Sequence, residues 1–386
     1  MLAENKKQHY VPKTYLKHFS NGKVFSVLNI DSNMIYENVS YASQCYENYF
    51  YGNNLEWEKR LNSMESKWGI VLDKICQGED IDDNDKALLK QFSVYQYNRT
   101  VAREQFNITS YKENLRETAK VILKRDEITD EEFGDFLEQK AKEMTSPEKT
   151  LEMVASIEEL IEDLEVIVID CISEAKLISS DAPVICINPF EPHGVGFGCM
   201  GLIIFFPVSD SKLVVIYDKK MYKSNSNIFV ISDKQEIYNL NAYQYISAER
   251  IIFGKSKEDL EFVSDDLMDE RVKNKEIKPV HSLGSLESKM IVMSNERIMY
   301  LGDLIFAHLS HEVRKIPLTC REAVPRKWEQ GWQDKLKHKE SIMPQLIKLR
   351  TINKDEIGMT AKEIKRGCRL MTNYAEKYWK INFEEG

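Results

Sequence analysis

The sequence lacks the features that place a chain in a membrane or outside the cell. No apolar run approaches the roughly 18 residues that cross a bilayer, and the start, which is rich in Lys, His and Gln, has no apolar signal segment. The seven cysteines include no CxxC pair and are odd in number, which favours reduced, mostly buried thiols. We therefore expect a cytoplasmic protein that is neither inserted in a membrane nor exported.

Motifs of several common functions are also missing. There is no GxGxxG after a strand and no GxxxxGKS/T, so a glycine loop that cradles nucleotide phosphates is not expected. The chain shows no Ser or Cys nucleophile elbow, no HNH-type zinc pattern and no HEAT repeats. The formal net charge of -9 argues against nucleic-acid binding over the whole surface, but it is compatible with a local basic groove.

The composition is that of a globular protein. With 386 residues, of which 42% are hydrophobic, the chain can bury a large core. Periodicity predicts an α+β fold that is mainly helical, with an antiparallel or mixed β-sheet from strands near 23–39 and 165–217 and a helical C-terminal extension. We expect a core domain over 1–260, a linker over 261–284 and a helical C-terminal region over 285–386.

The segment 8–20 places an ionisable imidazole, that of His9, among aromatic and apolar residues. Pro12 fixes its own φ and biases the preceding residue toward extended backbone, so a helix is expected to begin near Pro12. Apolar residues then recur at three- and four-residue spacing and predict a buried stripe: Tyr15, Leu16 and Phe19. His9 is thus expected beside a packed helix start; the alternative is a core histidine satisfied by one hydrogen bond.

A helix is predicted over 55–75. Glu58 and Glu65 lie seven residues apart and so share a face, with Leu61 between them. Carboxylates on the same face as a core leucine suggest a site, although charged residues that flank an apolar stripe in solvent explain the pattern equally simply.

A second helix is predicted over 86–106, and it carries the strongest signal from spacing alone. Polar and aromatic residues follow one face at i, i+4, i+7 and i+11: Phe92, Gln96, Arg99 and Arg103. A buried guanidinium needs an anionic partner, because desolvating it alone costs several kcal/mol. Glu58 or Glu65 would be the structural partner and a phosphate the functional one, since the planar fork of Arg suits either.

Two further groups of polar residues lie in the middle of the chain. Ser180 and Asp181 form a polar pair between two apolar strands, where they could be site residues or a turn that caps backbone groups. Asn241 and Gln244 share the inward face of a helix predicted over 233–250. Buried amides need partners, so this helix either meets the 86–106 helix over a polar pocket or caps a neighbouring loop.

The opening residues Gln8-His9-Tyr10-Val11-Pro12 with Tyr15-Leu16 and Phe19 resemble the start of the bacterial and phage family called domain of unknown function 4238. Further matches follow in the family's order between residues 7 and 254: Phe50-Tyr51; Glu58, Leu61 and Glu65; Phe92, Gln96, Arg99-Thr100 and Arg103; Ser180-Asp181 with Pro183; Phe206-Pro207 with Ser209; Asn241 with Ala248 and Arg250. The resemblance implies an association with defence and mobile-element neighbourhoods but no particular reaction.

Together these residues suit hydrolysis of a phosphodiester or a nucleotide. An imidazole can act as general acid or base, arginines stabilise charge on a phosphoryl group, and carboxylates orient the imidazole or hold a divalent metal such as Mg²⁺. The residues expected to be catalytic are His9, Glu58, Glu65, Gln96, Arg99 and Asp181. Those expected to bind the ligand are Gln8, Tyr10, Arg103, Ser180 and Asn241. The leading hypothesis is a cytoplasmic, nuclease-like effector of bacterial or phage conflict that acts on nucleic acid or a nucleotide.

Two other hypotheses fit the same residues. In the first, a non-enzymatic binding or sensor module recognises an anionic ligand or a phage component, and the region 285–386 signals to a protein partner or a second copy. In the second, His9, the glutamates and the arginines form a closed salt-bridge network with a purely structural role. An open cleft lined by these side chains would favour a site over a closed network.

Overall fold

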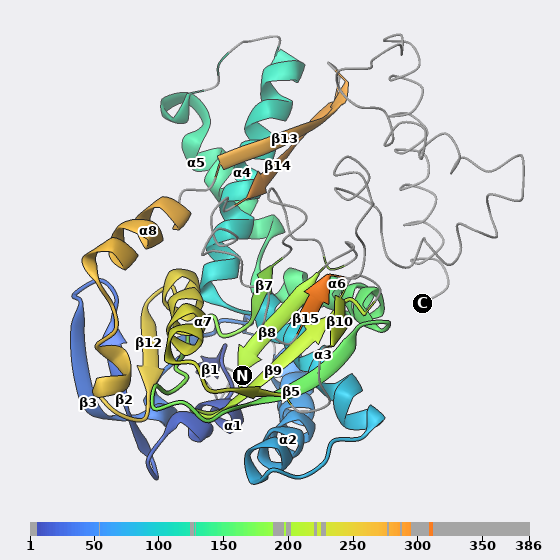
Figure 1. The fold of residues 1–386 in the computed structure, drawn as a ribbon. Coiled ribbons are helices and arrows are strands. Elements are labelled where there is room, and N and C mark those ends of the chain that lie inside the picture. The colour runs from blue at the N-terminus through green and yellow to red at the C-terminus, as the bar shows by residue number, and fades with distance from the viewer. Residues whose placement is uncertain are drawn as a thin grey trace, which may run out of the picture.

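The computed structural model describes residues 6–53, 55–123, 127, 129–187, 197, 202–219, 222–224, 229–275, 278–285, 288–294 and 309–311. Helices surround two main β-sheets in this part of the chain (Figure 1), which confirms the α+β class. No helix within these ranges is both long and apolar enough to cross a membrane.

The four-stranded sheet contains the expected N-terminal hairpin. Its strand order is β3 (Met34–Ser40), β2 (Val24–Asn29), β12 (Ile251–Gly254) and β6 (Ser179–Ser180), and all the pairs are antiparallel. The turn between β2 and β3 includes Asn33 at a φ of 51°, a conformation that Asn tolerates better than most residues. Pairing of β12 with β2 joins the end of the family-like region to its beginning.

The five-stranded sheet is mixed. Its strand order is β11 (Val230–Ile231), β5 (Glu165–Cys171), β9 (Lys212–Tyr217), β8 (Ile203–Pro207) and β7 (Ile185–Ile187), and only the β11–β5 pair is parallel. The strands read as almost continuous apolar runs because both faces of the sheet are covered, by α2, α3 and α6 on one side and by α7 on the other.

The helices that surround the sheets are α1 (Lys13–Leu16), α2 (Leu55–Gln77), α3 (Asp83–Asn98), α4 (Val101–Leu123), α5 (Asp130–Met144), α6 (Pro147–Glu158), α7 (Lys234–Ser247) and α8 (Asp265–Lys275). The single helix expected over 86–106 was wrong, because α3 ends and α4 begins within it. Arg99 leaves the helical conformation at φ -108° and ψ 23°, and Thr100 Oγ1 accepts a hydrogen bond from Arg103 N at the start of α4. Arg103 therefore does not continue the polar face of α3.

Aromatic packing fixes α1 against α2 and α3. Phe92 of α3 lies 5.6 Å from the Trp68 ring of α2 and 5.7 Å from the Tyr15 ring of α1, measured between ring centroids. On its other side Phe92 contacts Phe206 of β8 at 5.1 Å. Aromatic contacts of this kind add to the free energy of burial, so they stabilise the packing of the three helices.

The segment 261–284, expected to be a linker, contains regular structure. It includes α8 and most of β13 (Lys278–Ser285), which pairs with β14 (Ser288–Ser294) in a hairpin that lies beside α4 (Figure 1). In the region 285–386, expected to be helical, the described residues after β13 form β14 and β15 (Leu309–His311), and β15 pairs with β10 (Tyr222–Ser224). The remainder of that region lies outside the described residues, and the proposed division into domains stays a prediction.

Candidate functional site

Gln8 fixes the backbone around the opening motif. The residue lies in β1 (Lys7–His9), which pairs antiparallel with β4 (Tyr46–Asn48), and only 1% of its surface is exposed. Its Oε1 accepts a hydrogen bond from Tyr51 N at 2.6 Å, and its Nε2 donates to Gly52 O at 3.2 Å. Both polar atoms of the buried amide are thereby used, and the chain entering α2 is held beside β1.

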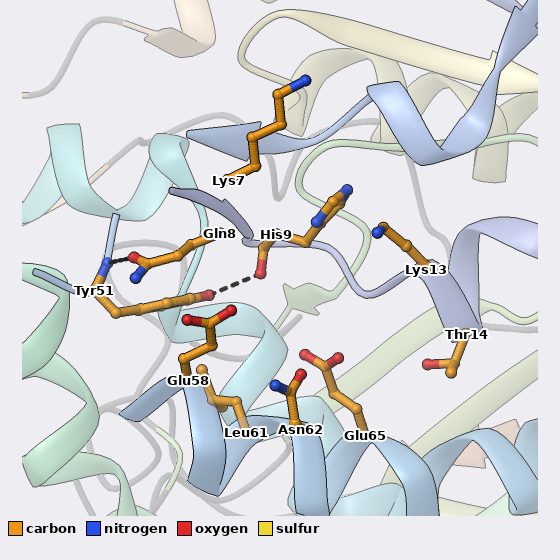
Figure 2. Close-up of a pocket in the computed structure, with 10 residues that line it drawn as sticks. All are labelled: Lys7, Gln8, His9, Lys13, Thr14, Tyr51, Glu58, Leu61, Asn62 and Glu65. Atoms are coloured by element: carbon orange, nitrogen blue, oxygen red, sulfur yellow. Dashed lines mark hydrogen bonds between the residues drawn. The ribbon is translucent and has the colours of Figure 1, made fainter. Parts of the chain in front are cut away.

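A pocket of about 200 Å³ lies between the β1–α1 segment and α2 (Figure 2). Its lining residues come from three parts of the chain: Lys7, Gln8, His9, Lys13, Thr14, Tyr51, Glu58, Leu61, Asn62 and Glu65. Four predicted site residues, namely Gln8, His9, Glu58 and Glu65, therefore meet in one cavity. These side chains therefore line an open cavity and do not form a fully closed salt-bridge network. The functional role of each residue stays a prediction.

His9 lies on the upper side of this pocket, toward Lys13 (Figure 2). Its Nε2 lies 3.2 Å from Ala42 O, and because a carbonyl can only accept, Nε2 carries the proton and Nδ1 the lone pair of the neutral ring. Burial lowers the pKa of His9 to about 4, with further lowering by the positive charges of Lys13, Arg99 and Lys7. At neutral pH the ring is uncharged and can accept a proton.

The carboxylates of Glu58 and Glu65 reach into the pocket from α2 (Figure 2). Leu61, which lies between them, is 2% exposed and anchors this face of the helix to the core. Glu58 Oε2 is buried and has no hydrogen-bond partner, and the same holds for Thr14 Oγ1 on the facing wall. Buried polar atoms in native proteins normally have partners, so these two atoms mark where a ligand or water belongs.

Gly69 allows the two walls of the pocket to come close together. A Cβ atom at this helical position would lie 3.2 Å from Cβ and Cγ2 of Thr14. That contact is tighter than ordinary van der Waals packing, so the absence of a side chain at residue 69 sets the position of Thr14 and hence the width of the pocket.

Arg99 and Gln96 support the pocket from behind without lining it. The Arg99 side chain is 0% exposed; its Nη1 lies 2.7 Å from Glu65 Oε1 and its Nε donates to Gln96 Oε1 at 2.9 Å. Gln96 Nε2 in turn donates to Tyr10 O at 2.9 Å. The guanidinium also lies 5.5 Å from the Trp68 ring centroid, while its Nη2 has no hydrogen-bond partner. The carboxylate partner of Arg99 is therefore Glu65.

Asp181 lies away from the pocket. Its carboxylate is 1% exposed, and its Oδ1 and Oδ2 accept hydrogen bonds from Glu249 N and Arg250 N, each at 2.8 Å. A carboxylate that accepts two backbone N–H groups satisfies the turn between α7 and β12. Participation of Asp181 in a reaction stays a prediction, and this structure does not bring it to the other carboxylates.

Ser180 and Asn241 belong to the same junction between α7 and the sheet. Ser180 Oγ donates to Gln244 Oε1 at 2.8 Å. Asn241 Oδ1 accepts from Ile178 N at 3.1 Å, and its Nδ2 donates to Lys176 O at 2.8 Å. The amides on the inward face of α7 thus hold the chain that leads into β6, rather than meeting α3 over a polar pocket.

Arg103 and Tyr10 also lie outside the pocket lining. The Arg103 guanidinium is 5.1 Å from the Tyr97 ring centroid and 4.6 Å from that of Phe106. Tyr10 is 2% exposed and packs on Phe50 at 5.5 Å between ring centroids. Burial raises the pKa of Tyr10, so its hydroxyl stays protonated. Tyr10 contributes to the pocket indirectly, because its backbone carbonyl accepts the hydrogen bond from Gln96 Nε2.

The pocket is also lined by residues that were not predicted to be site residues: Lys7, Lys13, Thr14, Tyr51, Leu61 and Asn62. Tyr51 and Leu61 were recognised only as matches to the family. Two of the others could have been predicted from their spacing to a site residue. Lys7 lies two residues before His9, the spacing that puts strand residues on one face, and Asn62 lies four residues after Glu58 on α2. Lys13 and Thr14 could not be predicted in this way, because their position depends on how α1 packs against α2. In the part of the chain that the structure describes, no three His, Cys, Asp or Glu residues are arranged to hold a metal ion.

Comparison with known proteins places the chain beside a protein family. A family model described as "Protein of unknown function (DUF4238)" matches residues 7–258, which include both main sheets and the pocket. No curated protein and no solved structure matches the chain.

Proposed function

The chain belongs to the DUF4238 family, and on that premise we propose that its pocket binds and hydrolyses a phosphate ester such as that of a nucleotide or a nucleic-acid end. The observation that carries the proposal is the buried Glu58 Oε2, which has no hydrogen-bond partner and belongs to a residue that lines the pocket. A carboxylate oxygen in this state is suited to accept a proton from a water molecule or a ligand hydroxyl.

The lysines of the pocket supply the charge that a phosphate needs. Lys7 and Lys13 both line the cavity and are exposed. Lys7 Nζ lies over the Tyr46 ring, 4.6 Å from its centroid, so this side chain would have to turn to reach an anion in the cavity. A lysine ammonium group binds phosphate oxygens as a point charge and requires no fixed geometry. Phosphate at the lysines would leave the hydroxyl or amino groups of the same ligand near the acceptor Glu65.

The volume of the pocket limits how much of the ligand is enclosed. Sites that enclose most of a drug-sized ligand usually measure about 300–1,000 Å³, whereas this pocket measures about 200 Å³. The phosphate and the adjoining sugar would fit, while a base or a longer strand would lie outside. A substrate with a phosphorylated end is therefore more suitable than the middle of a duplex.

The proposed reaction uses Glu58 as general base. Glu58 takes a proton from water, the water oxygen attacks phosphorus, and the P–O bond to the leaving alkoxide breaks. Lys7 and Lys13 stabilise the charge on the phosphoryl oxygens, and the proton on Glu58 is then passed to the leaving oxygen. A Mg²⁺ ion bound to the phosphate would need only one or two carboxylates, which Glu58 and Glu65 could supply.

The second proposal is ligand binding without turnover. It is favoured by the ion pair of Arg99 with Glu65. Because the buried guanidinium already binds this carboxylate, it does not stabilise a phosphoryl group as the catalytic hypothesis requires. In that case the pocket senses a phosphorylated ligand, and the region 285–386 passes the signal to a protein partner or a second copy. Under either proposal the family resemblance suggests a cytoplasmic role in bacterial or phage conflict.

The test is a turnover assay on the purified full chain. Nucleotides, single-stranded RNA and single-stranded DNA are incubated with the protein, with and without Mg²⁺ or Mn²⁺, and products are separated by chromatography. We expect phosphate release that falls at least 100-fold in Glu58→Gln and about tenfold in Lys13→Ala. Glu56→Gln and Lys67→Ala, both on exposed positions of α2, are the matched controls and should match the wild type.

The outcomes separate the two proposals. If a nucleotide raises the melting temperature of the wild type but not that of Lys13→Ala, and no product forms, the result supports binding and rejects hydrolysis. Neither product nor stabilisation across the panel, or turnover that is unchanged in Glu58→Gln, would reject the pocket as the active site.

A further inference from the structure

A second cluster of reactive groups lies at the far end of α2 and shares no residue with the pocket. Cys76 Sγ lies 3.3 Å from His18 Nδ1, and His18 Nε2 lies 3.4 Å from Asp73 Oδ1. His18 belongs to the short 3₁₀ helix Lys17–Phe19, while Asp73 and Cys76 are three residues apart on α2. The imidazole therefore lies between a thiol and a carboxylate, the order of groups that nucleophilic cysteine sites use.

We propose that Cys76, His18 and Asp73 form a thiol nucleophile site that takes a small, uncharged carbon electrophile. As the new C–S bond forms, the Sγ proton moves to His18 Nδ1, and the leaving group of the electrophile departs with its bonding electrons. Asp73 is a positioning residue: it orients the ring and stabilises the imidazolium that forms.

Accessibility sets Cys76 apart from the other described cysteines. Cys76 is partly exposed, whereas Cys45, Cys171 and Cys186 are buried. His18 Nε2 is buried and makes no aligned hydrogen bond in the neutral state. Its contact with Asp73 would tighten when the ring becomes charged, as catalytic hydrogen bonds often do only during reaction.

The charges around the cluster balance. Lys17 pairs with Asp73 at 2.7 Å, and Lys255 pairs with Asp210 at 3.0 Å. The charges that influence the pKa of His18 are those of Lys17, Asp73 and Lys255. The charges that influence the pKa of Cys76 are those of Asp73, Asp210 and Lys255, and the thiol also interacts with Ser209. Two carboxylates and two ammonium groups cancel, so neither an anionic nor a cationic reagent is preferred, which is why the proposal specifies an uncharged one.

The resting state of the cluster is a neutral thiol beside a neutral imidazole. Burial raises the pKa of Cys76 to about 11 and lowers that of His18 to about 4. Transfer of the proton from Sγ to Nδ1 changes no net protonation, so the amount of the thiolate–imidazolium pair does not depend on pH. The pair determines the rate as long as the negative charge of the thiolate, 3.3 Å away, keeps the proton on His18. A thiol without such a base reacts only as free thiolate, whose amount rises tenfold per pH unit.

The experiment measures alkylation of Cys76 by iodoacetamide in the folded full chain at pH 5, 6 and 7. Peptide mass spectrometry reports the rate at Cys76 separately from the other cysteines. We expect a rate that changes less than about threefold over these two pH units. In His18→Asn the rate should rise about 100-fold over the same range and lie at least tenfold below the wild type at pH 5.

The control variants test the role of the carboxylate. Asp73→Asn should lower the wild-type rate severalfold and keep the flat pH profile, whereas Asp31→Asn, at an exposed turn, should leave the rate unchanged. If His18→Asn does not fold, the wild-type profile decides alone. A tenfold rise per pH unit in the wild type, or no labelling of Cys76 while the chain is folded, overturns the proposal.

Discussion

Arg99 Nη1 lies 2.7 Å from Glu65 Oε1, and this contact joins the residue that follows α3 to α2 directly behind the pocket. The guanidinium is fully buried, while the Glu65 side chain is 16% exposed. The pair is thus asymmetric: loss of the carboxylate leaves a charge with no access to water, whereas loss of the guanidinium leaves a charge that still touches the cavity.

Glu65→Ala should lower the free energy of unfolding by about 3 kcal/mol, because it leaves the buried guanidinium without its counter-charge. Urea denaturation measures the change. Glu56→Ala, which breaks the exposed pair with Arg60, should cost less than about 1 kcal/mol. The double variant Arg99→Met with Glu65→Leu should recover part of the loss; a double variant that is no more stable than Glu65→Ala would contradict this account.

Stability should decline in acid because two histidines are held neutral by the fold. The pKa values of His9 and His18 are lowered to about 4 from the usual 6.5. Between pH 6.5 and pH 4 the unfolded chain therefore binds more protons than the folded chain, and the free energy of unfolding falls as the pH falls through this window.

This pH dependence is tested by urea denaturation at pH 7 and pH 5. His9→Asn and His18→Asn should each show a smaller difference between the two pH values than the wild type. Equal differences in all three proteins would mean that neither ring is held neutral.

Gln8→Ala should lower the free energy of unfolding by about 2 kcal/mol, since it removes both hydrogen bonds to the chain at Tyr51 and Gly52 and leaves buried backbone groups unpaired. Amide hydrogen exchange should show faster exchange of Tyr51 N–H. Gln44→Ala is the control, because the amide of Gln44 donates to the exposed Ser43 hydroxyl. An unchanged exchange rate at Tyr51 would be inconsistent with the role given to Gln8.

Arg271→Lys should lower the melting temperature although it keeps the charge. Arg271 Nη1 donates to Tyr245 O and Ile246 O at 3.0 Å and also to Ala248 O, and Nη2 donates to Glu249 O at 3.2 Å. An ammonium group cannot satisfy these carbonyls at the end of α7 as a planar fork does, and we expect a loss of about 1–2 kcal/mol. Differential scanning fluorimetry measures the shift; Lys257→Ala, on an exposed side chain, should show none.

Much of the fold could be predicted because its signals are local. Alternation and a turn at Asn33 give the β2–β3 hairpin. The helix predicted from residue 86 is α3, which begins at Asp83 because Asp82 and Asp85 cap it. The break between α3 and α4 was missed because Thr100 caps a helix inside an otherwise helical pattern. The helix at 265–275 was missed because its charged sequence resembles a linker, and its anchor, Arg271, is recognised only from tertiary contacts.

The pocket could be predicted only in part, because its composition depends on tertiary contacts. Glu58 and Glu65 could be paired from helical spacing, and His9 from its motif, but spacing cannot tell which polar groups are already satisfied. Asp181 illustrates this, since its carboxylate is used by two backbone N–H groups 68 and 69 residues further along the chain. The contribution of Thr14 depends on Gly69, and no local pattern connects those two positions.

The connection between α7 and β12 is clamped from two directions, by the carboxylate of Asp181 on its N–H groups and by the guanidinium of Arg271 on its carbonyls. Rotation of the backbone at this connection would break several of these hydrogen bonds at once. The helix that covers one sheet and the strand that belongs to the other must therefore move together, and any opening motion of the protein has to pivot at some other place.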